Sequence, residues 1–308
     1  MTPGAGFRRW GAHVSNWGRW GREDRLGTLN LIRPGHRAAA GRLIVTGEVV
    51  PLGLEFNADG PQPTGGLRPN TQHVMTRTGA AEPAVGGFQY TDDLVLMHTQ
   101  CATQIDGLAH VAYDGLLYNG HPVSTVTTDG AAVLGVEGFR SGIQGRGVLA
   151  DLPRHLGVER LLPEQEIGRA TLESCLDAQG VEVAAGDIVL IRTGWMQVFL
   201  VDGDRAGYLS TEPGIGLDTT AWLHERGVSF LASDNWAVEV VPAGLREEDM
   251  PVHCVLVRDM GMPLGEMFDL EALADHCART ARWEFWFSCH PLPITGGVGS
   301  PVAPVATF

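Results

Sequence analysis

Short β-branched runs and amphipathic helices alternate along the whole chain, and this pattern restricts the fold more than any other feature. The run Asp187–Thr193 is so apolar that we expect it at the centre of a sheet. Leu217–Arg226 has the pattern of an amphipathic helix that stops at Gly227 and leads into a strand over Val228–Ala232. The same reasoning predicts helices over Pro34–Leu43 and Leu270–Thr280, a strand beginning at Glu48, and strands over Asp93–His98, Gly147–Asp151 and Arg282–Ser288. The fold class is therefore predicted as α/β with a mixed, partly antiparallel sheet.

Residues 1–308 are expected to form a single domain, because no long linker interrupts this alternation. Apolar residues make up 44% of the chain, which is enough to bury a substantial core. Residues 1–30 are predicted to form an N-terminal arm that carries Trp10, Trp17 and Trp20. Such an apolar arm is costly to leave in water. It packs either on its own domain or across a contact with another subunit.

Two segments are predicted to form the mouth of a pocket. The first, Asn57–Gly87, is rich in Gly, Pro, Thr and Gln and is expected to be a loop. The second is the insert Leu200–Pro213. Neither contains a motif for a known ligand, so the substrate is not readable from them.

The charge balance excludes several kinds of partner. A formal net charge of −14 and a pI near 5.1 leave no basic stripe for nucleic acid. The N-terminus lacks the apolar run of a signal peptide, and no apolar stretch approaches the ~18 residues of a membrane span. We therefore expect a cytoplasmic protein that acts on a small molecule and contacts neither nucleic acid nor membrane.

The stretch from Gln100 to Asp114 holds the densest group of reactive side chains. On an extended backbone Gln104 and Asp106 share a face, and Asp106 and His110 would share a face once the chain turns helical. A strand that runs into a short helix would aim all three side chains at one point. That group suits either a hard metal ion or acid/base catalysis.

Cysteine chemistry is a weaker alternative. The five cysteines are odd in number and far apart, which indicates neither a disulfide framework nor a zinc knuckle. Cys101 lies inside the reactive stretch, and His98 or His110 could activate it as a nucleophile. The expected state is a small buried thiol.

Two later residues are candidates to complete the site. His253 precedes an apolar run, and Glu266 follows a Gly-Met-Pro-Leu turn. Their positions at element edges suit a cleft. Equally, His253 could be a hydrogen-bonded core residue and Glu266 a surface or helix N-terminal carboxylate.

Taken together, these motifs resemble the cyclase family that includes bacterial kynurenine formamidase and isatin hydrolase. The resemblance runs from about Trp17 to the C-terminus and rests on the order and spacing of several segments. These are Gln100-x-Ala-Thr-Gln104-x-Asp106-x-Leu-x-His110, Arg192-Thr-Gly-Trp195, Ser233-Asp-Asn-Trp236 with Glu239, Pro-Val-His253 with Glu266, and the closing Pro-Leu-Pro-Ile-Thr-Gly-Gly-Val-Gly-Ser-Pro. The resemblance implies a mixed α/β swivelling domain of β/β/α type, assembled as a homodimer or homotetramer.

The family signature is His-x-Gly-Thr-His-x-Asp-x-Pro-x-His, and its metal-dependent members bind zinc or manganese through the two leading histidines and the aspartate. This chain has Gln100 and Gln104 in place of those histidines, and Ala102 and Leu108 at two further positions. The glutamine pattern resembles that of a long-chain branch of the family. An amide oxygen is a weaker ligand than imidazole for zinc, so zinc binding should be weakened.

Three interpretations of the site stay open at this stage. In the first, a metal (zinc or manganese) is held by Asp106, His253 and Glu266. In the second, no metal binds, and His110 or His253 is a general base with Gln100 and Gln104 as hydrogen-bond donors. In the third, the protein binds a small molecule without converting it. The predicted function is hydrolysis of an amide, imide or lactone, with metal-free ring closure of an aromatic polyketide as the alternative. Substrate contacts are predicted from Thr103, Trp195 and Trp236.

Overall fold

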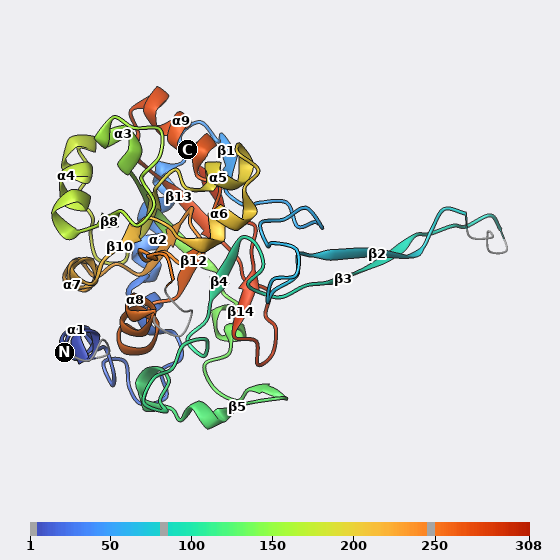
Figure 1. The fold of residues 1–308 in the computed structure, drawn as a ribbon, viewed down its shortest axis with the longest axis horizontal. Helices are drawn as coiled ribbons and strands as arrows, with labels where there is room; N and C mark the ends of the chain where they lie inside the picture. The colour runs from blue at the N-terminus through green and yellow to red at the C-terminus, as the bar shows by residue number, and fades with distance from the viewer. Residues whose placement is uncertain (1–4, 81–85, 245–249) are drawn as a thin grey trace.

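A nine-stranded mixed sheet organises the chain in this computed structural model, which describes residues 5–80, 86–244 and 250–308 (Figure 1). The strand order is β1-β15-β13-β7-β9-β11-β12-β4-β14. Three two-stranded sheets, β10-β8, β2-β3 and β5-β6, lie outside it. The predicted α/β class with a mixed sheet is confirmed.

The strands are short, as expected. They are β1 (Val49–Pro51), β2 (Gln72–Arg77), β3 (Asp92–Leu96), β4 (Gln104–Asp106), β5 (Val126–Thr127), β6 (Gly130–Ala131), β7 (Ile143–Asp151), β8 (Glu166–Ile167), β9 (Ile188–Arg192), β10 (Gly214–Ile215), β11 (Phe230–Ser233), β12 (Leu264–Glu266), β13 (Glu284–Cys289), β14 (Gly299–Pro301) and β15 (Val305–Thr307). The helices are α1 (Ala5–Val14), α2 (Pro34–Ala40), α3 (Leu152–Leu156), α4 (Arg169–Gln179), α5 (Met196–Leu200), α6 (Arg205–Ser210), α7 (Leu217–Arg226), α8 (Pro251–His253) and α9 (Glu271–Thr280), with a π-helix, η7, over Cys254–Met260.

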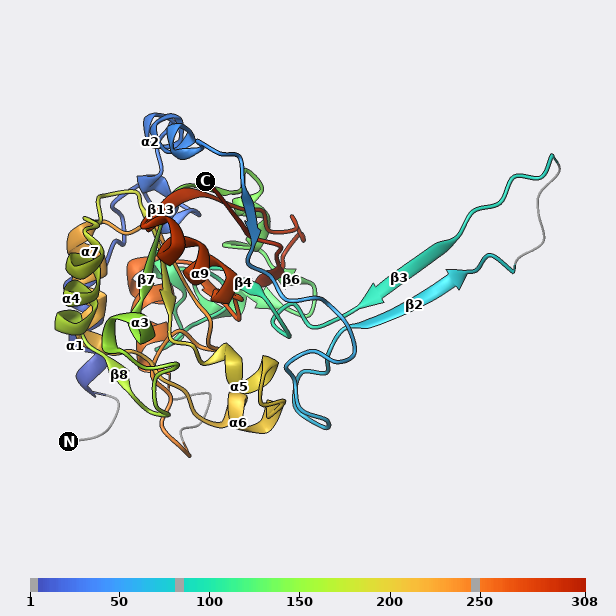
Figure 2. The ribbon, with the colours of Figure 1, turned by 90° about the horizontal axis from the view of Figure 1, so that it is seen from above.

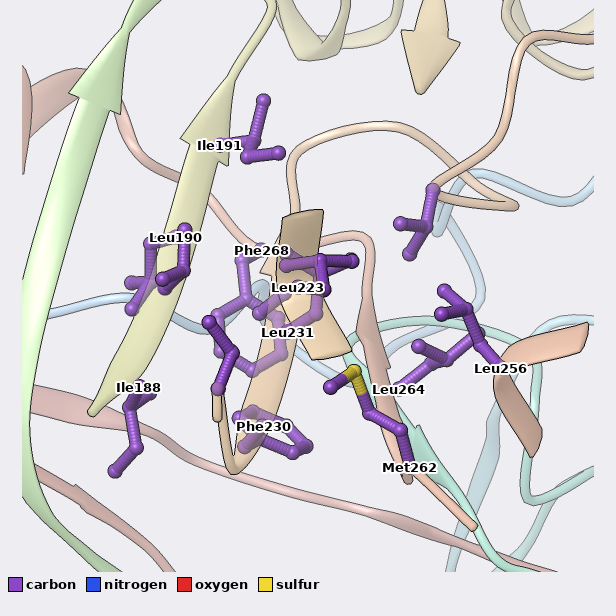
Figure 3. Close-up of a cluster of buried hydrophobic side chains, with 14 of the residues drawn as sticks. Ile188, Leu190, Ile191, Leu223, Phe230, Leu231, Leu256, Met262, Leu264 and Phe268 are labelled. Atoms are coloured by element: carbon purple, nitrogen blue, oxygen red, sulfur yellow. The ribbon is translucent and has the colours of Figure 1, made fainter. Parts of the chain in front are cut away.

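The centre of the sheet is parallel and apolar on both faces. Strand β9 pairs in parallel with β7 on one side and β11 on the other, and all its residues are buried. Figure 3 shows Ile188 and Leu190 of β9 beside Phe230 and Leu231 of β11. Burial on both faces explains why Ile188–Ile191 of this strand are continuously apolar rather than alternating, and it confirms the central position predicted from the sequence.

Helices α1, α4 and α7 lie along one side of the body (Figures 1 and 2). Helix α7 ends at Arg226 and is capped by Gly227, whose φ of +66° is a left-handed conformation that glycine adopts without strain. The N-terminal arm packs on its own chain: the indole N–H of Trp17 donates to the Arg258 carbonyl, and the Arg258 guanidinium lies 4.2 Å from the Trp17 ring centroid. Of the two placements open for this arm, the described contacts are with its own domain.

The segment that leaves the body is a hairpin whose first strand, β2, lies inside the stretch predicted to be loop, while its second, β3, confirms the strand predicted over Asp93–His98. Residues Asn57–Gly87 were expected to lack regular structure, but β2 pairs antiparallel with β3. Both views show this ribbon projecting far from the sheet (Figures 1 and 2). The loop prediction is wrong over β2, because Gly and Pro are confined to the parts of the segment that flank this strand.

No helix in the described ranges is long and apolar enough to cross a bilayer. The cytoplasmic location stays a prediction.

Candidate active site

Strand β4 carries the first two site residues and is held between β12 and β14. Gln104 and Asp106 are both buried and, two residues apart, point to the same face of the sheet. Glu266 on β12 lies directly opposite Gln104, and the Gln104 amide donates a hydrogen bond to its carboxylate. The neighbouring Gly265 has no room for a side chain, since a Cβ there would lie 2.8 Å from Ala232 Cβ. The face shared by Gln104 and Asp106 was predicted from the spacing, and the strand confirms it.

His110 reaches Asp106 through a turn and not through the predicted short helix. The His110 backbone N–H donates to the Gly107 carbonyl at 3.0 Å, which closes a tight turn after β4. Gly107 permits the close approach of this segment to Val298, because a Cβ there would lie 2.9 Å from the Val298 carbonyl oxygen. His110 Nε2 ends 3.7 Å from Asp106 Oδ1, and 24% of the His110 side chain is exposed. The predicted helix is therefore wrong, but the predicted proximity of His110 to Asp106 is confirmed.

His253 is fixed on both ring nitrogens. It ends α8 and precedes the π-helix η7, a rare geometry that often marks functional sites. Its Nδ1 lies 2.6 Å from Glu239 Oε1, and its Nε2 lies 3.0 Å from Glu266 Oε1 and 3.9 Å from Asp106 Oδ2. Glu239 also accepts the backbone N–H groups of Val252 and His253. Glu239 therefore orients the imidazole that faces Asp106.

The electrostatics of the site are dominated by buried carboxylates. Burial raises the pKa of Asp106 to about 6, opposed by His110 and reinforced by repulsion from Glu266. Burial acts to lower the pKa of His253, but its hydrogen bonds to Glu239 and Glu266 raise that pKa well above the ordinary value. His253 therefore holds its protons tightly, and the more exposed His110 is the better placed base.

These residues line one cavity of about 450 Å³. Its described lining is Arg68, Asp106, His110, Val111, Ala112, Trp236, Met250, His253, Cys254 and Glu266. Trp236, predicted to contact substrate, is part of this wall.

The other two predicted substrate contacts lie elsewhere. Trp195 is 4% exposed and packs in a separate apolar cluster, where its indole N–H donates to the Tyr208 carbonyl. The Thr103 hydroxyl donates to the Met267 carbonyl and accepts the Leu54 N–H, so its side chain ties β4 to its neighbours. Neither residue lines this cavity: Thr103 is hydrogen-bonded to neighbouring backbone, and Trp195 borders a different cavity, of about 400 Å³, beside Arg160 and Val198.

Three features of the site fit a divalent cation. One ligand atom each of Asp106, His253 and Glu266 lies within 4.8 Å of the other two. Gln104 Oε1 and Asp106 Oδ1 are buried and lack a hydrogen-bond partner in the described part of the chain, although buried acceptors normally have one. The carboxylates of Asp106, Glu239 and Glu266 exceed the charge that one imidazolium can neutralise. A cation would meet both needs.

The donor set differs in kind from two imidazoles and a carboxylate. It consists of two carboxylates, one imidazole and the amide oxygen of Gln104, while Gln100 accepts a hydrogen bond from Thr99 at 2.7 Å. Oxygen-rich sets suit manganese or magnesium better than zinc. The Gln100 amide nitrogen, like Gln104 Oε1, has no partner among the described residues.

The cysteines near the site are not arranged as nucleophiles. Cys101 is fully buried, its Sγ contacts Thr71 Oγ1 at 3.6 Å, and burial raises its pKa. Cys254 lines the cavity, but burial raises its pKa to about 12. A thiol with a raised pKa is a poor nucleophile, so the buried-thiol interpretation of Cys101 fits best.

Sequence reasoning missed Arg68 and the role of Glu239. Arg68 lies in the segment predicted as a pocket mouth, but nothing in its local sequence separates it from other arginines. Glu239 was noted only as part of a motif. Its link to His253 spans fourteen residues between separate elements, which no local pattern reveals.

Comparisons with known proteins agree with this architecture. Residues 50–240 match the sequence model of the Cyclase family. The crystal structure of a novel cyclase is 38% identical, with a TM-score of 0.90, over 97% of this chain and 99% of that chain. Isatin hydrolase A from Ralstonia solanacearum is 18% identical, with a TM-score of 0.60, over 84% of this chain and 91% of that chain.

A predicted metal-dependent hydrolase from Bacillus stearothermophilus is 14% identical, with a TM-score of 0.55, over 85% of this chain and 98% of that chain. At these low identities, the likeness to the isatin hydrolase and to this hydrolase is one of fold alone. No curated protein matches the chain.

Proposed function

This chain belongs to the Cyclase family, and from that premise we propose that it is an enzyme that hydrolyses an amide, imide or lactone. The observation that carries the proposal is the pair Asp106 and His110, which meet at 3.7 Å on the wall of a cavity. His110 is the proposed base, and Asp106, 3.7 Å from its Nε2, orients the ring and stabilises its protonated form. His253 and Glu266 complete the polar wall opposite.

The proposed reaction uses these groups in two steps. His110 takes a proton from a water molecule whose oxygen attacks the substrate carbonyl carbon. The C–N or C–O bond then breaks, and the leaving nitrogen or oxygen receives that proton from His110. With no ion bound, the positive charge on His253 favours the negative oxygen of the tetrahedral intermediate, and an ion held through a neutral His253 would supply that charge instead.

We propose that a divalent cation, manganese in preference to zinc, is held by Asp106, His253 and Glu266, with the Gln104 amide oxygen as a further donor. Such an ion would supply Lewis-acid polarisation of a carbonyl oxygen. The unpartnered buried oxygens of Gln104 and Asp106 support this assignment.

The alternative, ring closure of an aromatic polyketide, is less well supported. That reaction needs a deep apolar pocket for several fused rings. The cavity at Asp106 is about 450 Å³, and most of its described lining side chains are titratable. A small polar carbonyl compound suits this lining better.

A substrate panel tests the reaction. Formanilide, isatin, succinimide and dihydrocoumarin are incubated with the full-length protein in manganese, zinc or chelator, and ring opening or deformylation is followed by absorbance and chromatography. Isatin is included because isatin hydrolases share the fold. We expect the wild-type protein to turn over at least one of these compounds, and we expect His110→Ala to abolish that turnover. Ring closure of a linear polyketone without turnover of this panel would contradict it.

Gln104→His is expected to change metal preference. The substitution places an imidazole on β4 opposite Glu266, beside Asp106. An imidazole nitrogen is a stronger zinc ligand than an amide oxygen, so zinc affinity should rise on the order of tenfold or more while manganese affinity changes little. Competition with a chromophoric chelator measures both. Gln165→His, outside the cavity, is the control, and an equal rise in both variants would argue against the assigned site.

We also propose that the chain is a homo-oligomer in which the β2–β3 hairpin contacts another copy. Leu94 and Leu96 share one face of the ribbon and are 47% and 65% exposed. An isolated two-stranded ribbon is marginally stable in water, and exposed apolar side chains at this density are typical of a contact surface.

Leu94→Lys combined with Leu96→Lys is expected to dissociate the oligomer, so that the molar mass measured in solution falls to that of one chain. Charged side chains on that face cannot be desolvated at low cost. Light scattering on a sizing column measures the mass, and Leu162→Lys, which replaces a 70% exposed leucine elsewhere, should leave it unchanged. A wild-type protein that is monomeric at micromolar concentration would exclude the oligomer.

A further inference from the structure

A second cavity adjoins the site and shares two of its wall residues. It measures about 190 Å³, and Arg68 and Trp236 line both cavities. The remaining wall of the second cavity is largely apolar, with Pro63, Leu67, Leu209 and Met267. Residues 62–68, which precede β2, and Leu209 of the insert Leu200–Pro213 supply parts of this wall, as expected for a pocket mouth. The two cavities form a polar end and an apolar end that meet at Arg68 and Trp236.

Arg68 has hydrogen-bonding capacity that the protein does not use. Its one described contact is from Nη1 to the Gln100 carbonyl at 3.5 Å, the outer limit of a hydrogen bond. Among the residues that the structure describes, no carboxylate lies within salt-bridge distance of it. A guanidinium carries five N–H donors in a planar fork that matches a carboxylate. Arg68 therefore presents a vacant cationic edge to the junction of the cavities.

Trp236 adds a second unused donor at the same junction. Its indole Nε1 is buried and has no hydrogen-bond partner within the described ranges. Indole nitrogen can only donate, and a buried donor without an acceptor destabilises the protein. An acceptor supplied by a ligand would remove that cost. The neighbouring guanidinium favours an acceptor that carries negative charge.

The charge distribution fixes where such an acceptor would sit. In the metal-free protein the polar end holds Asp106 and Glu266, which repel an anion, whereas Arg68 attracts one. A substrate whose carbonyl lies at His110 therefore points its anionic group toward Arg68 and its apolar part into the second cavity. We propose that Arg68 and Trp236 form a carboxylate subsite, and that the substrate is a carboxylate-bearing apolar carbonyl compound. This inference rests on the proposed hydrolytic function for the position of the carbonyl, but the subsite itself is testable without turnover.

Benzoate and benzamide are the probes, because they match in size and ring but differ in charge. Titration of the full-length protein in chelator, so that no cation can bind the carboxylate, is followed by calorimetry and by tryptophan fluorescence. We expect saturable binding of benzoate and binding of benzamide at least tenfold weaker. Arg68→Met should weaken benzoate binding about tenfold and leave benzamide binding unchanged, while Arg68→Lys should retain part of the benzoate affinity. Arg33→Met, an exposed arginine outside both cavities, is the matched control.

Trp236→Phe separates the second donor from the ring. It keeps the apolar wall and removes the N–H, so benzoate and benzamide should both lose affinity by a similar several-fold factor. Circular dichroism confirms that each variant is folded. Equal binding of the two probes to the wild type, or unchanged benzoate binding by a folded Arg68→Met variant, would overturn the subsite. If either result is found but formanilide is hydrolysed, the subsite is wrong and the proposed hydrolytic function stands. If benzoate binds selectively but no panel compound is turned over, the subsite stands and the hydrolytic function is wrong.

Discussion

Asp106→Asn is expected to abolish hydrolysis while making the folded protein more stable. Loss of the carboxylate removes the group that orients His110, and loss of a positioned acid/base group costs on the order of 10²–10⁴ in rate. Asparagine keeps the size of the side chain but carries no charge. Activity on the substrate panel and unfolding by urea, both measured against wild type, test the two halves of the prediction.

The stability gain follows from the raised pKa. Burial moves the pKa of Asp106 from 3.8 to about 6, so the folded state binds the proton more tightly than the unfolded state. Asp106 therefore makes its full contribution to the free energy of unfolding below roughly pH 4, and this contribution is lost as the pH rises from about 4 to about 6. Above that window the ionised carboxylate costs the folded state about 1–3 kcal/mol, and the neutral amide of the Asp106→Asn variant would avoid that cost.

The measurement is made in chelator, so that no cation offsets the charge. Urea unfolding at pH 4 and pH 7 should show a smaller fall in stability for Asp106→Asn than for wild type. Asp59→Asn replaces a 92% exposed aspartate and should match wild type in activity and stability. Retained turnover would remove Asp106 from the site, and an unchanged pH dependence would show that its charge is not buried at a cost.

His253→Ala is expected to destabilise the protein by about 3–5 kcal/mol and to abolish metal binding. The imidazole lies between the carboxylates of Glu239 and Glu266, at 2.6 Å and 3.0 Å. Its removal leaves both carboxylates buried without their cationic partner, and a broken buried pair costs about that much. It also removes one of the three groups that could share an ion. Urea unfolding and elemental analysis of the manganese-loaded protein measure the two effects.

A double substitution separates charge from packing. Adding Glu239→Gln to His253→Ala removes one stranded carboxylate, so the double variant should be more stable than His253→Ala alone. His276→Ala is the matched control, because His276 is 4% exposed and lies 3.3 Å from Glu48, outside the cavity. That control should lose stability yet keep its metal. Metal retained in full by His253→Ala would place the ion elsewhere.

The parts of the site that the sequence could predict are those governed by spacing along one element. Gln104 and Asp106 are two residues apart on β4, and the two-residue period of a strand puts them on one face wherever that strand lies. The apolar run of β9 indicated its central position for a similar reason. His110 was predicted near Asp106 for the wrong reason, since a turn at Gly107 replaces the helix.

Residues that meet through the tertiary structure could not be predicted in this way. Trp195 and Trp236 lie in similar motifs, yet Trp195 is buried in a separate cluster with Tyr208 and Trp236 lines the cavity. Arg68 comes from a loop and reaches the junction of two cavities. Their contacts depend on how separate elements are packed, which the local sequence does not encode.

The sequence alone therefore determined an α/β fold, the apolar strand at its centre and the face of β4 that carries Gln104 and Asp106, because hydrophobic periodicity and residue spacing act within one element. Only the tertiary structure decided that Glu239 orients His253, that Arg68 faces the cavity, and that a hairpin and not the N-terminal arm leaves the body. These features depend on long-range packing and on the cost of burying charge, which are properties of the assembled chain.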